Sequence, residues 1–239
     1  MVTQDRVALV FAERAEGAFK YCHSTGAWFR WTGQYWAKDE CAAAFQYARN
    51  LARSFTSSLT NGELKEIGKV SFAAGVERFA QSDPRLAVSA EWWDNDPFLL
   101  GTPGGTVNLR TGELRPSQPS EGVSRVTAVA PDLKADCPRW LAFLDEATGG
   151  DREVARFLQQ WGGYCLTGVT REHALVFVYG PGGNGKSVWL NTITAVLNGY
   201  ATTAAMDTFT ASAGDKHPTD LAMLRGARLV TASETEEGR

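Results

Sequence analysis

The chain has 239 residues, a length that fits one large domain or two small ones. Apolar residues make up 44% and charged residues 21%, as in ordinary globular proteins. The formal net charge of −3 gives no overall positive field, so any contact with DNA has to come from a local patch or from a ring of subunits. No apolar run reaches the ~18 residues of a membrane helix, and charges interrupt the apolar N-terminal stretch, unlike in a signal peptide. We therefore expect a cytoplasmic protein with no membrane partner.

The cysteines give no sign of a metal site. The four are Cys22, Cys41, Cys137 and Cys165. They form no CxxC pair and no Cys/His cluster with zinc-ligand spacing. We predict free thiols in a reducing compartment.

Aromatic residues mark the beginning of the chain. Residues 5–20 carry apolar side chains at helical spacing, which predicts a helix. Alternating aromatic and polar residues then predict a β-hairpin with strands at 27–30 and 34–37. The hairpin contains three tryptophans: Trp28, Trp31 and Trp36. They form either a platform on which bases stack or a small aromatic core, and we favour the core because aromatic residues mainly serve in packing.

Helices and short strands alternate in the middle of the chain. Residues 40–56 are predicted helical, with Arg49 and Arg53 on one face. A solvated face is the simpler interpretation of this pair, and a phosphate contact is the alternative. Glycine and proline positions predict further elements: a hairpin of 106–109 with 113–115, a strand at 123–129, and a linker over about 116–136.

Helical spacing returns at Cys137. The first apolar face comprises Trp140, Leu141, Phe143 and Leu144. Asp151 is placed to cap a second helix that ends near residues 162–163. We expect the apolar side chains of that helix to point inward: Val154, Phe157, Leu158 and Trp161.

The next segment, LVFVYGPGGNGKSVWL at 175–190, contains a complete G-x-x-x-x-G-K-[ST] motif. Residues 174–179 form an apolar run typical of a buried parallel strand, and residues 187–197 are predicted helical. Glycines let the backbone turn sharply and point N–H groups at an anion, and a helix N-terminus adds positive potential. In this motif the lysine reaches the phosphates and the serine hydroxyl ligates Mg²⁺. The predicted binding residues are Gly180, Pro181, Gly182, Gly183, Asn184, Gly185, Lys186 and Ser187.

A second element is needed for hydrolysis, namely a strand that ends in an acid. Residues 229–232 form a short β-rich stretch, with Glu234 at its carboxyl end and Glu236 close behind. Such carboxylates hold Mg²⁺ or polarise an attacking water. We assign Glu234 to Mg²⁺ or the water, and we predict a catalytic set of Lys186, Glu234 and Glu236. An ordinary acidic loop is the alternative.

Three stretches then carry a family resemblance: WDNDPFLLGTPGGTVNLRTGEL (93–114), FLQQWGGYCLTGVTREHALVFVYGPGGNGKS (157–187) and HPTDLAMLRGARLVTASETEEGR (217–239). The chain resembles the helicase region of phage and plasmid primase–helicases. This group is related to satellite-phage and poxvirus primases, within helicase superfamily 3. The tryptophan hairpin also fits the N-terminal helper domain of that family.

The resemblance implies an α/β fold with an AAA+-like superfamily 3 P-loop NTPase core, incomplete at its C-terminus. It implies a mixed α+β helper domain over 1–136 and a partial ATPase domain over 137–239. Gly180, Gly185, Lys186 and Ser187 would bind ATP and Mg²⁺, and Glu234, joined by Glu236, would be the Walker B acid. Three residues fall in a stretch typical of the family without an assigned role: His217, Asp220 and Arg225.

The function that the resemblance implies is an ATP-dependent DNA helicase of phage, prophage or plasmid replication in a bacterial host. Its partners would be single-stranded or forked DNA, other copies in a homo-oligomeric ring, a primase and further replication proteins. The family has a sensor residue, a DNA-contacting loop and an arginine finger beyond the point matching Arg239. We therefore expect this chain to be a truncated portion, poorly active alone.

Two other functions stay open. A small-molecule P-loop kinase usually has its loop near the N-terminus and an arginine-rich lid after it, whereas about 175 residues precede the loop here. A non-catalytic DNA-binding or assembly module with a remnant P-loop is the second alternative.

Overall fold

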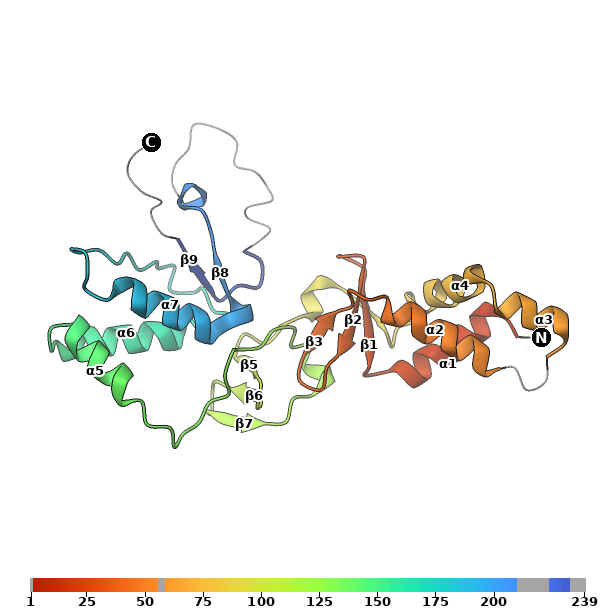
Figure 1. Ribbon diagram of the computed structural model, residues 1–239, viewed down its shortest axis with the longest axis horizontal. Helices are drawn as coiled ribbons and strands as arrows, with labels where there is room; N and C mark the ends of the chain where they lie inside the picture. Colours follow the sequence, from red (N-terminus) through yellow and green to blue (C-terminus); the bar gives the residue numbers. More distant parts are fainter. Residues whose placement is uncertain (1, 56–58, 210–223, 233–239) are drawn as a thin grey trace. The chain divides into compact units, whose positions relative to one another are not determined.

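The computed structural model describes residues 2–55, 59–209 and 224–232. Figure 1 shows their helices and strands. They form two compact units, described separately below. The first unit comprises Met1–Asn95 with Gln118–Ser124, and the second comprises Asp96–Ser117 with Arg125–Arg239. In the part of the chain that is described, no helix has both the length and the apolar content to cross a membrane.

The first unit is a helical layer packed on a small mixed sheet. Its helices are α1 (Gln4–Ala15), α2 (Ala43–Ser54), α3 (Asn61–Ile67) and α4 (Val70–Ala80), with short 3-10 turns η2 (Ala90–Trp92) and η3 (Pro119–Glu121). Its strands are β1 (Phe19–Cys22), β2 (Ala27–Trp31), β3 (Trp36–Lys38) and β4 (Ala87–Val88), in the order β3-β2-β1-β4. Only the β1–β4 pair is parallel among these pairs.

Helix α1 is shorter than predicted. The Thr3 side chain accepts a hydrogen bond from Arg6 N, which caps its start. The helix ends at Ala15, and Gly17 follows with φ of 78°. Residues 19–22 then enter the sheet as β1, so the prediction of a helix over 5–20 was wrong at its C-terminal end. A glycine in the left-handed region stops the helix, and the FKYC segment finds a strand partner in β2.

The tryptophan hairpin is confirmed as β2 and β3, with Trp31 opposite Trp36. Trp28 is 7% exposed and donates its Nε1–H to Glu77 Oε1 at 2.8 Å. Trp36 is fully buried and donates its Nε1–H to Pro119 O at 2.9 Å. These two side chains are part of the packed interior, which confirms the core interpretation for them.

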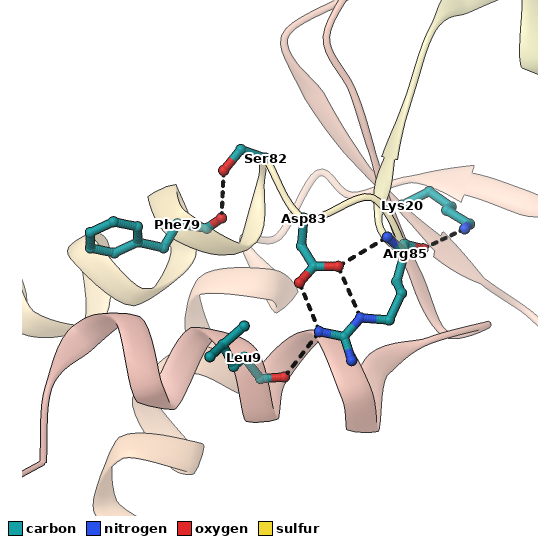
Figure 2. A network of polar contacts seen from close by, with 6 residues as sticks. All are labelled: Leu9, Lys20, Phe79, Ser82, Asp83 and Arg85. Carbon is teal, nitrogen blue, oxygen red and sulfur yellow. Dashed lines mark hydrogen bonds and ion pairs between the residues drawn. The ribbon is translucent and has the colours of Figure 1, made fainter.

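A polar network lies around Asp83 and Arg85, just before β4 (Figure 2). The Arg85 guanidinium donates to both carboxylate oxygens of Asp83, at 2.9 and 2.8 Å. Lys20 of β1 donates to Arg85 O at 2.6 Å. These hydrogen bonds from the Arg85 side chain lower the pKa of Asp83. The network therefore joins β1 to the turn between α4 and β4.

The second unit combines a three-stranded antiparallel sheet, three helices and a parallel strand pair. Its helices are α5 (Pro138–Ala147), α6 (Arg152–Tyr164) and α7 (Lys186–Leu197), with 3-10 turns η4 (Asn198–Tyr200) and η5 (Met206–Thr208). Its strands are β5 (Leu99–Thr102), β6 (Gly105–Asn108), β7 (Glu113–Arg115), β8 (Ala201–Thr203) and β9 (Leu229–Thr231). The sheet orders are β5-β6-β7 and β8-β9.

Local signals predicted several of these elements. The β6–β7 hairpin is confirmed, as is the cap of α6, where Asp151 accepts from Glu153 N and Val154 N. The prediction that the apolar side chains of α6 point inward is wrong for Val154 and Phe157, which are 44% and 49% exposed.

All four cysteines are free, and burial raises the pKa of Cys165 to about 11.

The predicted strand at 123–129 does not form. Its backbone makes single hydrogen bonds to separate elements instead of a ladder. Val123 O accepts from Trp36 N, and Thr127 N donates to Gly101 O at 3.0 Å. A β-rich stretch thus becomes an irregular connection because its hydrogen-bond partners belong to different elements.

The buried phenol of Tyr200 organises the second unit. Its hydroxyl donates to Arg125 O at 2.8 Å and accepts from Gly101 N at 2.9 Å. Its ring packs with Leu100, Val107 and Leu197 in the core of this unit. One side chain therefore ties the turn after α7 to β5 and to the segment that follows Ser124.

Two arginines complete this junction. Arg125 donates to Gly199 O at 2.7 Å and to Arg225 O at 2.8 Å. Arg228 lies with its guanidinium carbon 4.3 Å from the centre of the Tyr200 ring and donates to Leu99 O at 2.7 Å. Arginine is suited to this position because its planar fork bonds several carbonyls while stacking on a ring.

This junction explains why the compact units do not divide at residue 137. Strands β5 and β6 contribute to the same core as α6, α7 and β9, and β7 pairs with β6. The structural division therefore follows Asn95, and the chain crosses back once over 118–124. The compact units do not test the assignment of 1–136 to a helper domain and of 137–239 to an ATPase domain. That assignment stays a prediction.

Replacing Tyr200 with Phe tests the junction. The substitution keeps the ring but leaves Gly101 N–H and Arg125 C=O without their partner, which costs about 1–3 kcal/mol of unfolding free energy. Urea denaturation measures it, with Tyr179→Phe as the control because Tyr179 is 81% exposed. Equal stability of the two variants would contradict the role given to the Tyr200 hydroxyl.

Replacing Asp83 with Asn tests the network of Figure 2. The pKa of Asp83 is lowered in the folded state, so its stabilising contribution is present above the unfolded pKa of about 3.9 and is lost as pH falls through the lower folded value. We expect Asp83→Asn to destabilise the protein at pH 7 and the difference from wild type to shrink in acid. Denaturation at several pH values measures this difference. In an Arg85→Gln background the pH-dependent difference should largely disappear, and its persistence there would contradict the assignment.

Candidate functional site

The glycine-rich loop adopts a conformation that requires its glycines. Gly180, Gly183 and Gly185 have φ values of 141°, 79° and 84°. L-residues with side chains rarely adopt these values. Gly185 is the N-cap of α7, which confirms the helix predicted after the loop. The loop therefore leads directly into a helix N-terminus.

The two sides of the loop differ in packing. A Cβ at Gly185 would lie 2.8 Å from Phe143 Cε2 and 3.2 Å from Ala147 Cβ, so α5 closes this side. Added Cβ atoms at Gly182 and Gly183 would meet no atom within 4 Å. The open side of the loop leaves room for a ligand.

Lys186 lies folded against the loop. Its ammonium donates three hydrogen bonds, to Gly180 O at 2.9 Å, to Pro181 O at 2.9 Å and to Asn184 Oδ1 at 2.7 Å. Its side chain is half-buried, whereas Ser187 in the first turn of the same helix is exposed. The structure thus brings the predicted lysine, serine and glycines together at one end of α7.

The chemistry of this cluster suits a phosphate group. The first N–H groups of a helix lack intrahelical partners, and the helix end carries partial positive charge. Helix α7 has no acidic residue in its first turn to compete with an anion. The ammonium adds a full positive charge beside these N–H groups. The residues present therefore fit an anionic phosphate ligand, and the Ser187 hydroxyl fits a ligand of Mg²⁺.

The segment before the loop differs from the prediction. Residues 174–179 adopt neither helix nor strand, and they form no ladder with any strand among the described residues. Leu175, Phe177 and Tyr179 are 79%, 67% and 81% exposed. The apolar composition predicted a buried parallel strand, and that prediction was wrong here. A strand needs a neighbour for its backbone hydrogen bonds, which composition alone cannot supply.

The second predicted element is only partly described. Leu229–Thr231 forms β9, as predicted, and pairs in parallel with β8. Helix α7 contacts both strands. The predicted acids Glu234 and Glu236, like His217 and Asp220, lie outside the described residues. Within the described ranges, no group of three or more His, Cys, Asp or Glu could hold a metal ion.

An apolar cleft of about 980 Å³ lies among α5, α6 and α7. Its walls include Trp140, Leu144, Leu158, Ile193 and Val196.

Two contacts of the loop were not predictable from the sequence. The helical spacing of 140–144 indicated an apolar face, but it did not indicate that Phe143 lies against Gly185. The contact between Asn184 and Lys186 was also missed, because the motif leaves position 184 unspecified.

The structure is that of a mixed α/β protein with a glycine-rich loop that leads into a helix N-terminus. Comparison with protein families refines this class. A family model described as D5 N terminal like matches residues 8–149, more than half of the chain. The chain therefore belongs to the D5 N-terminal-like family, the N-terminal region of phage and viral primase–helicases. The match ends before the glycine-rich loop.

A curated relative gives a shorter match. The uncharacterized mitochondrial protein ymf21 of Marchantia polymorpha is 31% identical over 84 residues. The match covers 34% of this chain and 46% of the relative, so the chain spans about half the length of that protein.

Gly185→Ala tests the closed side of the loop. The backbone at 185 is in the left-handed region, which costs a residue with a side chain about 1–2 kcal/mol, and the new Cβ also meets Phe143. Gly149→Ala is a matched control, since Gly149 has φ of 64° and no atom within 4 Å of an added Cβ. Urea denaturation should show a larger loss for Gly185→Ala. Equal losses would contradict the contact, and a Phe143→Ala background should make the Gly185→Ala loss smaller.

Proposed function

We propose that this chain carries the ATP-binding loop of a primase-associated, ATP-dependent DNA helicase of phage, prophage or plasmid replication. The observation that carries the proposal is the loop itself, where Lys186 and the glycines gather at the N-terminus of α7. Family membership supports the replication context.

In this proposal the loop holds the phosphates of ATP through two kinds of contact. Backbone N–H groups of Gly182–Ser187 face the β-phosphate, and Lys186 contacts the β- and γ-phosphates. Ser187 ligates Mg²⁺, which neutralises phosphate charge when it is bound. Glu234 is assigned to Mg²⁺ or to the attacking water, with Glu236 beside it.

The motor function needs partners. We propose single-stranded or forked DNA as the track and a homo-oligomeric ring as the active assembly. A primase and other replication proteins would act with it. An arginine from a neighbouring subunit would stabilise the transferred phosphoryl charge, an effect of about 10³–10⁵ in rate.

The other two functions differ in their expected response to DNA. A small-molecule kinase would show turnover that rises with a metabolite and ignores DNA. A non-catalytic assembly module would bind DNA without ATP turnover. The burial of Trp28 and Trp36 takes two of the three hairpin tryptophans out of reach of a stacking base, which weighs against a module that binds DNA through this hairpin.

Lys186→Ala tests nucleotide binding in this chain. Loss of a charged contact to phosphate, about 1.5–3 kcal/mol, should weaken Mg-ATP binding by about tenfold or more in calorimetry. Lys134→Ala is the control, because Lys134 is exposed and lies outside the loop. In steady-state assays, ATPase activity should rise with single-stranded DNA and collapse in Lys186→Ala. Activity that responds to a metabolite and not to DNA would contradict the helicase.

A further inference from the structure

The Lys186 ammonium has no hydrogen-bond donor left for a ligand. A lysine ammonium carries three N–H groups. All three are used inside the loop, on two backbone carbonyls and on Asn184 Oδ1. A phosphate can therefore receive a hydrogen bond from Lys186 only after one of these three contacts breaks.

Asn184 is the one side chain among the three acceptors, and its bond is the shortest at 2.7 Å. Its placement depends on Gly180, six residues before Lys186. A Cβ at Gly180 would lie 2.9 Å from Asn184 Nδ2. The absence of a side chain at Gly180 thus gives the Asn184 amide the room to lie across the loop.

We propose that Asn184 is a positioning residue that holds Lys186 inside the loop in the nucleotide-free protein and releases it to phosphate. This role rests on the proposed function, since the released ammonium serves an incoming nucleotide. A neutral amide oxygen is suited to the exchange, because a phosphate oxygen is charged and is the stronger acceptor. A carboxylate at 184 would hold the ammonium more tightly and repel the phosphate.

Amine acetylation of the nucleotide-free chain measures this contact directly. A limiting amount of an N-hydroxysuccinimidyl acetate reagent is added, and mass spectrometry gives the rate at Lys186. Asn184→Ala should raise that rate by about 3- to 10-fold, the effect of one hydrogen bond. Asn184→Asp keeps an acceptor and should react at the wild-type rate or more slowly. Exposed Lys134 in the same sample is the internal control and should not change.

Two results would overturn the proposal. One is an unchanged Lys186 rate in Asn184→Ala. The other is an equal increase in both variants, which would indicate a general loosening of the loop. Far-UV circular dichroism checks that each variant folds.

Calorimetry with Mg-ATP separates this proposal from the proposed function. Asn184→Ala should bind Mg-ATP at least as tightly as wild type, and Asn184→Asp should bind about tenfold more weakly. If wild type binds Mg-ATP but the three labelling rates agree, the role of Asn184 fails alone. If Lys186 is acetylated faster in Asn184→Ala than in wild type and Asn184→Asp, but wild type does not bind Mg-ATP, the proposed nucleotide function fails. The release of Lys186 to phosphate then fails with it.

Discussion

The second unit depends on the buried Tyr200 hydroxyl. It bonds at once to Gly101 N in β5 and to Arg125 O, while Arg228 covers the ring. A hydroxyl in this position has to be fully bonded, because burial without partners is costly. Moving the β5-β6-β7 sheet away from the end of α7 would therefore break the hydrogen bond between Gly101 N and the Tyr200 hydroxyl. This is why β5, β6 and β7 belong structurally with the loop-bearing part of the chain.

The loop takes its shape from the same packing. Helix α7 is fixed at its C-terminal end by Leu197 and the Tyr200 turn, both buried. At its N-terminal end, Gly185 lies against Phe143 of α5. With both ends of the helix held, the glycine loop has one open side, where Lys186, Ser187 and the first N–H groups of the helix converge. The site is thus a product of helix packing as well as of its motif.

Short-range features of the fold were predictable from the sequence. The tryptophan hairpin, the β6–β7 hairpin, the Asp151 cap and the start of α7 each depend on residues within a few positions of one another. The end of α1 and the state of residues 174–179 depend on whether a partner strand is present. The Tyr200 bonds span 99 and 75 residues, and no local pattern marks them. For the site, the motif predicted which residues gather, whereas the Asn184–Lys186 contact required the folded loop.

The proposed helicase function requires that the loop at the start of α7 binds the phosphates of ATP. Hydrogen–deuterium exchange of the chain with and without saturating Mg-ATP tests it most directly, since bound phosphate accepts hydrogen bonds from the loop N–H groups. We expect slower amide exchange over residues 180–189 when Mg-ATP is bound. Unchanged exchange over these residues, with slowing elsewhere in the chain, would contradict it.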